Sequence, residues 1–370
     1  VASVTVLVTT NHLAVLIVAW FATDVGLHQL LTFFRTRRQA IIVAHKKFLL
    51  SRVADACFVS AIVLVGSTMG SLRIDVVNTV AQTNGALSPT VHIATILLVF
   101  GVLLKTAQVP FHGWMLQVME APTPVSALLH AGVVNIGGFV MIRLAPLMAH
   151  APIAQSILVG VGLFTTIAAS LVMTTRVAIK GVLAWSTIGQ MGFMLVQCGL
   201  GAWHMALMHL LAHSLYKAHT FLSAGSVVTQ WRASHIATLF LTGHESPGIT
   251  PLAFVLGLSF VPMIARAIAA GGRALRLTAG LTVGVSALYF GWHFAFEEIA
   301  PLITMGTSTS TPQWSLVLGG LVVLFLTQSI LQTRPSGRFA NWLQPHLLSG
   351  LYIDDWFTRV TFRLWPPGLE

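Results

Sequence analysis

Uncharged apolar runs of about twenty residues recur along this chain, and they constrain its fold more than any other feature. Residues 152–173 form one such run, without a single charged side chain. An α-helix needs about 20 apolar residues to cross a bilayer. The chain is 55% hydrophobic and only 8% charged, where soluble domains average about 25% charged residues. Because the runs are continuous and do not alternate, they disfavour a β-barrel. The sequence predicts an all-α polytopic membrane protein.

Charge and cysteine usage exclude other classes of protein. The net charge is +10, but it comes from only 20 Lys and Arg residues, which lie mostly in short loops. This pattern is typical of positive-inside topology and lacks the dense basic stripe of a nucleic-acid-binding face. Cys57 and Cys198 lie far apart in apolar helices, with no CxxC pattern. They therefore indicate neither a disulfide framework nor a zinc site.

The apolar runs predict an ordered series of spans in the first two thirds of the chain. We expect spans at 11–34, 48–66, 91–108, 125–144, 152–173, 182–200 and 203–228. A basic loop at 35–47 and a second one marked by Arg176 and Lys180 are placed on the cytoplasmic side. Residues 67–90 are interpreted as a polar loop. Because residues 1–10 already belong to a helix, we expect N-terminal helices to precede this sequence.

The remaining third of the chain predicts three further segments. We expect residues 1–232 to form the ion-translocating bundle. A polar linker at 233–249 follows it, and then additional membrane helices within 250–335, at 251–268, 275–294 and 314–331. A tucked, non-spanning 251–268 is preferred because it keeps the basic tail inside. The tail at 336–370 places Arg359 and Arg363 among aromatic residues. It is interpreted either as an interfacial amphipathic helix or as a helix that packs on a partner subunit.

A lysine and a helix break coincide in the third of these spans. Lys105 lies inside an apolar run, five residues before Pro110, and Phe111 begins a short second half-helix. A lysine at bilayer depth costs at least about 2.5–3.5 kcal/mol. Non-helical backbone at that depth is tolerated only inside protein or beside a wet cavity. The sequence therefore predicts a discontinuous helix near Pro110 that serves an ion path, with Glu120 as a further ionisable group just beyond it.

Histidine and lysine side chains on later spans extend this path. His130 lies six residues after Pro124, and histidine can exchange protons near neutral pH. His209, His213 and Lys217 repeat at i, i+4 and i+8, which places them on one face of one helix. We interpret this face as a proton wire. The same HxxxH spacing also suits a haem or a metal ion, and a plain polar seam between helices is the third interpretation.

Acidic partners for these cations are few. Arg52 and Asp55 stand at i, i+3 and are expected to form an ion pair within the membrane. Asp24 is the single acid of its span, so we expect it to be the counter-charge of Lys105. Lys180 adjoins a basic loop and serves either as a gate or as a topology signal.

At this point the segment KTAQVPFHGWMLQVMEAPTPVSALLHA resembles the core motif of a known family. It is similar to the proton-pumping, antiporter-like subunits of respiratory complex I and of Mrp-type cation/proton antiporters. FLLSRVADACF, VAIKGVLAWSTIGQMGFM and HLLAHSLYKAHTFLSAGSV extend the resemblance to about 60% of the chain. The resemblance implies an antiporter-like helical bundle, with Lys105 as the buried pump lysine, His130 and Lys217 as relay residues, and Arg52–Asp55 as the coupling pair.

The chain departs from this family at three places. Phe21 follows Trp20 where the family has a glutamate, and Asp24 stands one turn further on as its substitute. The family's Trp-Leu-Pro-Asp is replaced by WMLQ. The second broken helix is not evident after Arg232, where Pro262 is interpreted as its remnant.

With these departures, the chain resembles the membrane-subunit (DabB) family of the DAB inorganic-carbon accumulation system. That resemblance implies a multi-pass protein of a bacterial cytoplasmic membrane, which couples proton or sodium flux to CO2 hydration. The partner would be a cytoplasmic, zinc-dependent, carbonic-anhydrase-like (DabA-like) subunit that carries the zinc and the catalysis. We expect no cofactor in this chain. The alternatives are a complex I-like pump or Mrp-type antiporter subunit, a haem-binding oxidoreductase using His209 and His213, and a structural scaffold.

Overall fold

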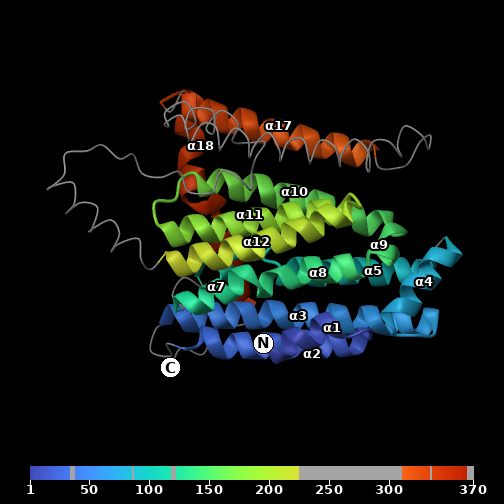
Figure 1. Ribbon diagram of the computed structural model, residues 1–370. Coiled ribbons are helices and arrows are strands. Elements are labelled where there is room, and N and C mark those ends of the chain that lie inside the picture. Colours follow the sequence, from blue (N-terminus) through green and yellow to red (C-terminus); the bar gives the residue numbers. More distant parts are fainter. Residues whose placement is uncertain (34–37, 86, 118–121, 225–310, 334–335, 365–370) are drawn as a thin grey trace, which may run out of the picture. The chain divides into compact units, whose positions relative to one another are not determined.

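The computed structural model describes residues 1–33, 38–85, 87–117, 122–224, 311–333 and 336–364 (Figure 1). The described helices fall into two units. Helices α1 to α12 with α18 and α19 belong to the first unit, and α17 (Thr311–Thr333) belongs to the second. Within the described ranges the regular secondary structure is helical, apart from one isolated bridge between His12 and Arg73. The predicted all-α membrane fold is confirmed.

Most predicted spans appear as helices with nearly the expected bounds. They are α2 (Leu13–Leu31), α5 (Pro89–Lys105), α10 (Pro152–Met173), α11 (Ile179–Gly199), α12 (Trp203–Ser223) and α17. The short α1 (Ala2–Thr9) precedes them. Six described helical stretches are long and apolar enough to cross a membrane. The helix α12 is not among the six, because its polar side chains lower its mean hydropathy. The predicted linker and the runs at 251–268 and 275–294 lie outside the described residues.

The basic loop expected at 35–47 is largely helix instead. The helix α3 runs from Arg38 to Met69, so Lys46 and Lys47 lie inside it and are buried. The prediction was wrong because two adjacent lysines were interpreted as solvated, whereas each has a carboxylate partner elsewhere in the fold. Paired charges can be buried where single ones cannot.

The polar loop expected at 67–90 likewise contains a helix, α4 (Ile74–Asn84). It packs against α9 (Ala145–Ala149), and Figure 1 shows the two together at one end of the bundle. Next in the chain, Ser88 caps α5, since its hydroxyl accepts a hydrogen bond from the Val91 N–H. Asn78 Nδ2 donates to the carbonyl of Arg143 at 3.1 Å, which ties α4 to the end of α8.

The discontinuous helix predicted near Pro110 is present. The helix α5 ends at Lys105, residues 106–112 are not helical, and α6 (Gly113–Gln117) follows. Ala107 adopts a left-handed backbone conformation with φ of 53°, and the Val109–Pro110 peptide is cis. The short α6 packs against both α3 and α11, so the break lies between these two helices.

A second interruption, which the sequence did not predict, divides the next span. The helix α7 (Thr123–Ala131) is followed by the 3₁₀ turn η2 (Val133–Asn135) and then by α8 (Ile136–Arg143). At the start of α8, Gly137 lies against Thr106, where any Cβ would overlap the threonine methyl group. The absence of a side chain at Gly137 therefore lets α8 approach the break in the preceding helix.

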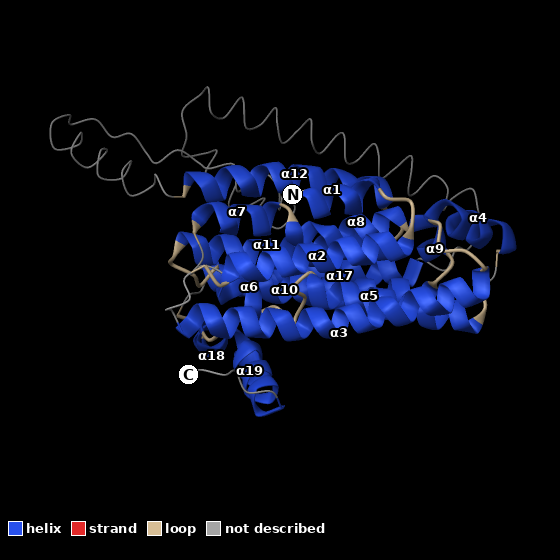
Figure 2. Ribbon diagram, turned by 90° about the horizontal axis from the view of Figure 1, so that it is seen from below, coloured by secondary structure: helices blue, strands red, loops and turns tan. Residues whose placement is uncertain are grey.

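The C-terminal tail forms α18 (Arg338–Leu348), the turn η5 (Gly350–Tyr352) and α19 (Ile353–Leu364). Figure 2 shows α18 and α19 next to one another beside the bundle. The guanidinium of Arg176 donates to the carbonyl of Leu347 at 3.2 Å. Lys46 of α3 pairs with Asp354 of α19 at 3.1 Å. The tail thus packs on the bundle of its own chain, which neither of the two sequence interpretations specified.

Candidate functional site

Lys105 lies at the centre of a buried ion cluster formed by three helices. Its Nζ donates to Asp24 Oδ2 of α2 at 2.7 Å and to Asp55 Oδ1 of α3 at 2.6 Å. The lysine is 4% exposed. It is also the last residue of α5, where the helix dipole favours a positive charge. The ion pair expected between Asp24 and Lys105 is therefore present, although its part in conduction stays a prediction.

Each of the two carboxylates has a second cation as partner. Lys47 Nζ donates to Asp24 Oδ1 at 2.8 Å and also to the hydroxyl of Ser51. Arg52 Nη2 pairs with Asp55 Oδ2 at 2.8 Å, as the i, i+3 spacing predicted. We call Lys47, Asp24, Lys105, Asp55 and Arg52 the central charge network. Positive and negative groups alternate along it, which is the arrangement that lowers the cost of buried charge.

Sequence reasoning missed Lys47, although a signal for it was available. Lys47, Ser51 and Asp55 stand at i, i+4 and i+8, so they share one face of α3. The expected start of the span at Phe48 hid this pattern. A search for polar residues on one helix face, carried one turn into the basic segment, would have found it.

Aromatic rings surround the cations of the network. Lys105 Nζ lies 4.7 Å from the ring centroid of Trp20 and 5.3 Å from that of Phe58, and these two rings stack at 4.8 Å. Lys47 Nζ lies 5.1 Å from the ring centroid of Trp114. Ring faces attract cations and exclude water. The rings therefore hold Lys105 and Lys47 in place while the carboxylates balance their charge.

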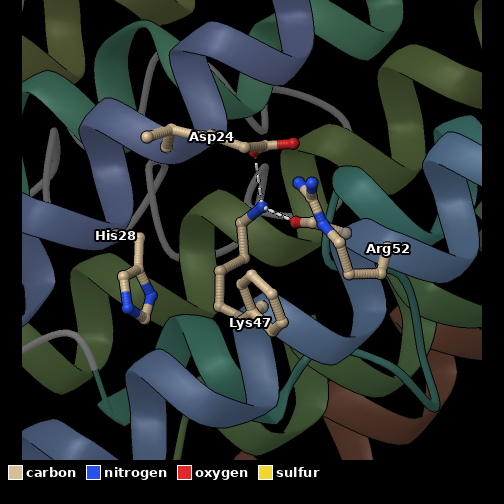
Figure 3. Close-up of a pocket in the computed structure, with 7 residues that line it drawn as sticks. Asp24, His28, Lys47 and Arg52 are labelled. Carbon is tan, nitrogen blue, oxygen red and sulfur yellow. Dashed lines mark hydrogen bonds and ion pairs between the residues drawn. The ribbon is translucent and has the colours of Figure 1, made fainter.

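A cavity of about 90 Å³ adjoins one side of the network. Figure 3 shows Asp24 and Lys47 pointing toward one another there, with His28 and Arg52 on either side. The cavity is lined by Asp24, Val25, His28, Lys47, Phe48, Ser51 and Arg52. The atoms exposed to this space are almost all apolar, although Asp24, Lys47 and Arg52 contribute to its walls. The space therefore adjoins the network on the side of α2 and α3.

A second group of polar residues lies on α12 and the helices around it. Lys217 is fully buried, and its Nζ donates to Ser186 Oγ at 2.8 Å and to the carbonyl of Leu183 at 3.3 Å. His213 contacts Gln190 through Nδ1 and the carbonyl of His130 through Nε2, the latter at 3.2 Å. We call Lys217, His213, His130, Ser186 and Gln190 the second cluster. Unlike the central charge network, it contains no carboxylate.

His130 is fully buried and stacks on Phe221, with the ring centroids 4.4 Å apart. Neither of its ring nitrogens has a hydrogen-bond partner in the described protein, and the same holds for the Ser126 hydroxyl one turn earlier. Buried polar groups in native proteins nearly always have a partner, which is often an ordered water. His130 and Ser126 are therefore buried polar groups of α7 whose hydrogen-bonding capacity the described protein leaves unused.

The predicted face of α12 is present. His213 and Lys217 are buried on it, and the His209 ring lies 6.0 Å from the His213 ring. His209 contacts Gln197 through Nδ1 at 3.0 Å. Within the described ranges, no group of three or more His, Cys, Asp or Glu side chains is placed to hold a metal ion. Whether the face conducts protons stays a prediction.

Two further predicted residues lie apart from these groups. Lys180 is the second residue of α11 and is half-buried, and no hydrogen bond or ion pair joins it to either group in the described structure. Glu120 lies outside the described residues.

The break between α5 and α6 lies between the two groups and carries its own buried polar atoms. Gln108 Nε2 donates to the carbonyl of Thr106 at 3.0 Å, and the Val109 N–H donates to Thr165 Oγ1 at 3.1 Å. His112 is buried, with its ring centroid 5.0 Å from that of Trp185, and neither of its nitrogens has a partner in the described protein. Sequence reasoning did not select His112, although its place in the break was a sufficient signal.

Comparisons with known proteins show which proteins this chain is similar to. The profile of the family described as "NADH:quinone oxidoreductase/Mrp antiporter, TM" matches residues 10–269. A "Probable inorganic carbon transporter subunit DabB" of Hydrogenovibrio crunogenus is 39% identical over 99% of this chain and 74% of its own length. Its counterpart DabB2 of Halothiobacillus neapolitanus is 36% identical over 97% of this chain and 71% of its own length.

A solved structure supports the fold. A chain of the Mrp complex from Dietzia sp. DQ12-45-1b superposes with a TM-score of 0.63 at 20% identity, and the match covers 98% of this chain and 47% of that one. This chain therefore spans about half of that antiporter chain.

Proposed function

Because the chain belongs to the NADH:quinone oxidoreductase/Mrp antiporter transmembrane family, we propose that it is the ion-translocating membrane subunit of an inorganic-carbon transporter. In this proposal, proton or sodium flux down its gradient through this chain drives CO2 hydration in a cytoplasmic partner. The partner would be a zinc-dependent, carbonic-anhydrase-like subunit, and catalysis would take place there. The relatives' description as inorganic carbon transporter subunits supports the substrate class.

The observation that carries the proposal is the position of Lys105 between two carboxylates at a helix break. Both carboxylates keep a second cation, Lys47 for Asp24 and Arg52 for Asp55. Lys105 can therefore lose and regain a proton without leaving a buried carboxylate unpaired. An isolated buried carboxylate would be costly, whereas a paired one is tolerated. This arrangement suits a group that changes its charge during turnover.

The second cluster and the break supply groups for the rest of the path. A proton held by Lys217 has His213 one turn away on the same helix and His130 on the neighbouring α7. Beyond them, the polar atoms of residues 106–112 lead to Lys105. We propose this order of residues for the path, with Arg52–Asp55 at its other end. We propose that the network exchanges with water on the side of α2 and α3, where a small space with a largely apolar lining adjoins Asp24 and Lys47.

The direct test is flux through the complex, purified with its partner and reconstituted in vesicles that contain a pH-sensitive dye. Lys105→Met is expected to lower the rate of proton uptake at least about tenfold, which corresponds to about 1.4 kcal/mol. Arg73→Met is the control, because Arg73 is an exposed cation that pairs with Asp75 outside both polar groups. The proposal would be overturned if the Lys105→Met complex had wild-type flux and if cells carrying it grew like the wild type at the CO2 concentration of air.

A second candidate function is a subunit of a complex I-like pump or of an Mrp-type antiporter. The family profile and the superposition on a chain of an Mrp complex support it. Purification from the native host separates the two candidates. Copurification of one large soluble zinc protein is expected for the inorganic-carbon transporter, and copurification of several membrane subunits with quinone or sodium chemistry for the alternative.

A further inference from the structure

We infer that Asp354, on the C-terminal helix α19, is a gate carboxylate that holds the tail of the chain against the broken helix α5–α6. The inference rests on the proposed ion flux through that break. It assigns a role to a residue that lies more than 200 positions beyond the break in the sequence.

The partner of Asp354 is a lysine that water does not reach. Lys46 of α3 is 0% exposed, and its Nζ donates to Asp354 Oδ1 at 3.1 Å and to Oδ2 at 3.3 Å. In the described part of the chain, no other carboxylate lies within ion-pair distance of Lys46. A buried ammonium without a partner is strongly unfavourable. The tail helix therefore supplies a carboxylate to a lysine for which the described helices of the bundle supply none.

The Asp354 carboxylate also lies directly on the first residue of α6. A Cβ added at Gly113 would overlap the carboxylate, so only glycine leaves room for it. Gly113 follows His112, the buried and unpartnered histidine of the break. The negative charge of Asp354 is thus placed at the point where the broken helix resumes.

Further contacts hold α19 over the same short segment. The Phe357 ring meets the Phe111 ring edge-on, with the centroids 5.6 Å apart, and Phe362 lies 6.1 Å from the His45 ring. Earlier in the tail, the Leu347 carbonyl accepts hydrogen bonds from Arg176 and Thr175, at 3.2 and 3.4 Å. The tail is therefore fixed at two places, the loop between α10 and α11 and the junction of α3 with α6.

Movement of α19 would change the break in two ways. It would withdraw the carboxylate from the Gly113 turn, and it would uncover the end of the polar segment 106–112. In the closed arrangement α19 covers that end with Phe357 and Asp354. We therefore expect loss of the Lys46–Asp354 pair to increase ion leak that is not coupled to turnover.

The first measurement is hydrogen–deuterium exchange of α19 in the purified complex. Asp354→Asn is expected to speed exchange of the α19 amides at least about tenfold, because exchange reports local opening. Asp355→Asn is the matched control, since Asp355 is the adjacent acid and is exposed. Equal exchange in wild type, Asp354→Asn and Asp355→Asn would overturn the inference.

The second measurement is proton leak in reconstituted vesicles without CO2. Asp354→Asn and Lys46→Met are each expected to raise the leak several-fold, and the exchanged pair Lys46→Asp/Asp354→Lys to lower it again. Gly113→Ala displaces the carboxylate without removing its charge, and should raise the leak as well. Gly181→Ala is its control, because a Cβ there meets nothing closer than 3.9 Å.

The outcomes separate the gate from the proposed function. Faster exchange with an unchanged leak would mean that Asp354 only anchors the tail, which overturns the gate. Equal proton flux in the wild type and in Lys105→Met would overturn the proposed function. The exchange data would still decide whether Asp354 fixes α19.

Discussion

At the residue scale, the composition of the central charge network matters more than any single ion pair. Lys105, Lys47 and Arg52 share the two carboxylates of Asp24 and Asp55, so the network has one positive charge in excess. A proton can therefore leave one cation and the remaining charges still balance. Removing a carboxylate instead increases the excess of positive charge, because it leaves buried cations facing one another.

We predict that Asp24→Asn destabilises the protein by about 3–5 kcal/mol, the usual cost of breaking a buried pair from one side. Lys47 would lose its carboxylate, and Lys105 would keep only Asp55. Thermal unfolding in detergent, followed by circular dichroism, measures the change in Tm. The double variant Asp24→Asn/Lys47→Met should recover more than half of the loss.

The control for this prediction is Asp75→Asn. Asp75 pairs with Arg73 in an exposed position at the start of α4, and hydrogen bonds from Arg73 lower the pKa of Asp75 to about 2. Exposed pairs contribute little to stability. Equal losses of Tm in Asp24→Asn and Asp75→Asn would contradict the interpretation of the network as a buried, interdependent unit.

At the scale of elements, the broken helix is stabilised by a neighbouring helix. The Val109 N–H lies in the non-helical segment and donates to Thr165 Oγ1 of α10 at 3.1 Å, with both groups buried. A buried N–H without an acceptor costs about 1–3 kcal/mol. The Thr165 hydroxyl thus accepts the hydrogen bond that a backbone carbonyl would accept in a continuous helix.

We predict that Thr165→Val lowers the free energy of unfolding by about 1–3 kcal/mol and reduces flux, because it removes the acceptor of the Val109 N–H with little change of shape. Thr174→Val is the matched control, since the exposed Thr174 hydroxyl donates only to Leu171 of its own helix. The two variants are compared by Tm and by proton uptake in vesicles. Identical results for the two would show that Thr165 does not support the break.

The sequence predicted some elements well and others poorly, for physical reasons. The run at Pro152–Met173 has the same bounds in the structure, since its hydrophobic length and the proline of its first turn determine it locally. The break at Pro110 was likewise readable, because proline removes a backbone donor. The start of α3 was not, since the burial of Lys46 and Lys47 depends on Asp354 and Asp24, which are distant in sequence.

At the scale of the whole molecule, the basic loops gather at one end of the first unit. The α10–α11 loop with Arg176 and the early part of α3 with Lys46 both contact the C-terminal tail. At the opposite end, α4 packs on α9, and Arg143 donates to the carbonyl of Thr10 at 3.2 Å. From the positive-inside rule, we expect the first end to face the cytoplasm.

We predict that Val177→Cys reacts with a membrane-impermeant maleimide only in inside-out vesicles, and that Gln82→Cys reacts only in intact spheroplasts. Val177 is 98% exposed in the α10–α11 loop, and Gln82 is exposed on α4. The background variant is Cys57→Ala/Cys198→Ala, which removes both native thiols. Labelling of both positions from the same side would contradict the topology.

The contact between Lys47 and Asp24 also has a consequence for the evolution of this chain. A lysine at 47 is tolerable only while a carboxylate one helix away neutralises it, and a carboxylate at 24 is needed only while both lysines remain. A substitution at either position alone would therefore give a destabilised protein. In an alignment of relatives, we expect these two positions to be gained and lost together, whereas Arg73 and Asp75 vary independently.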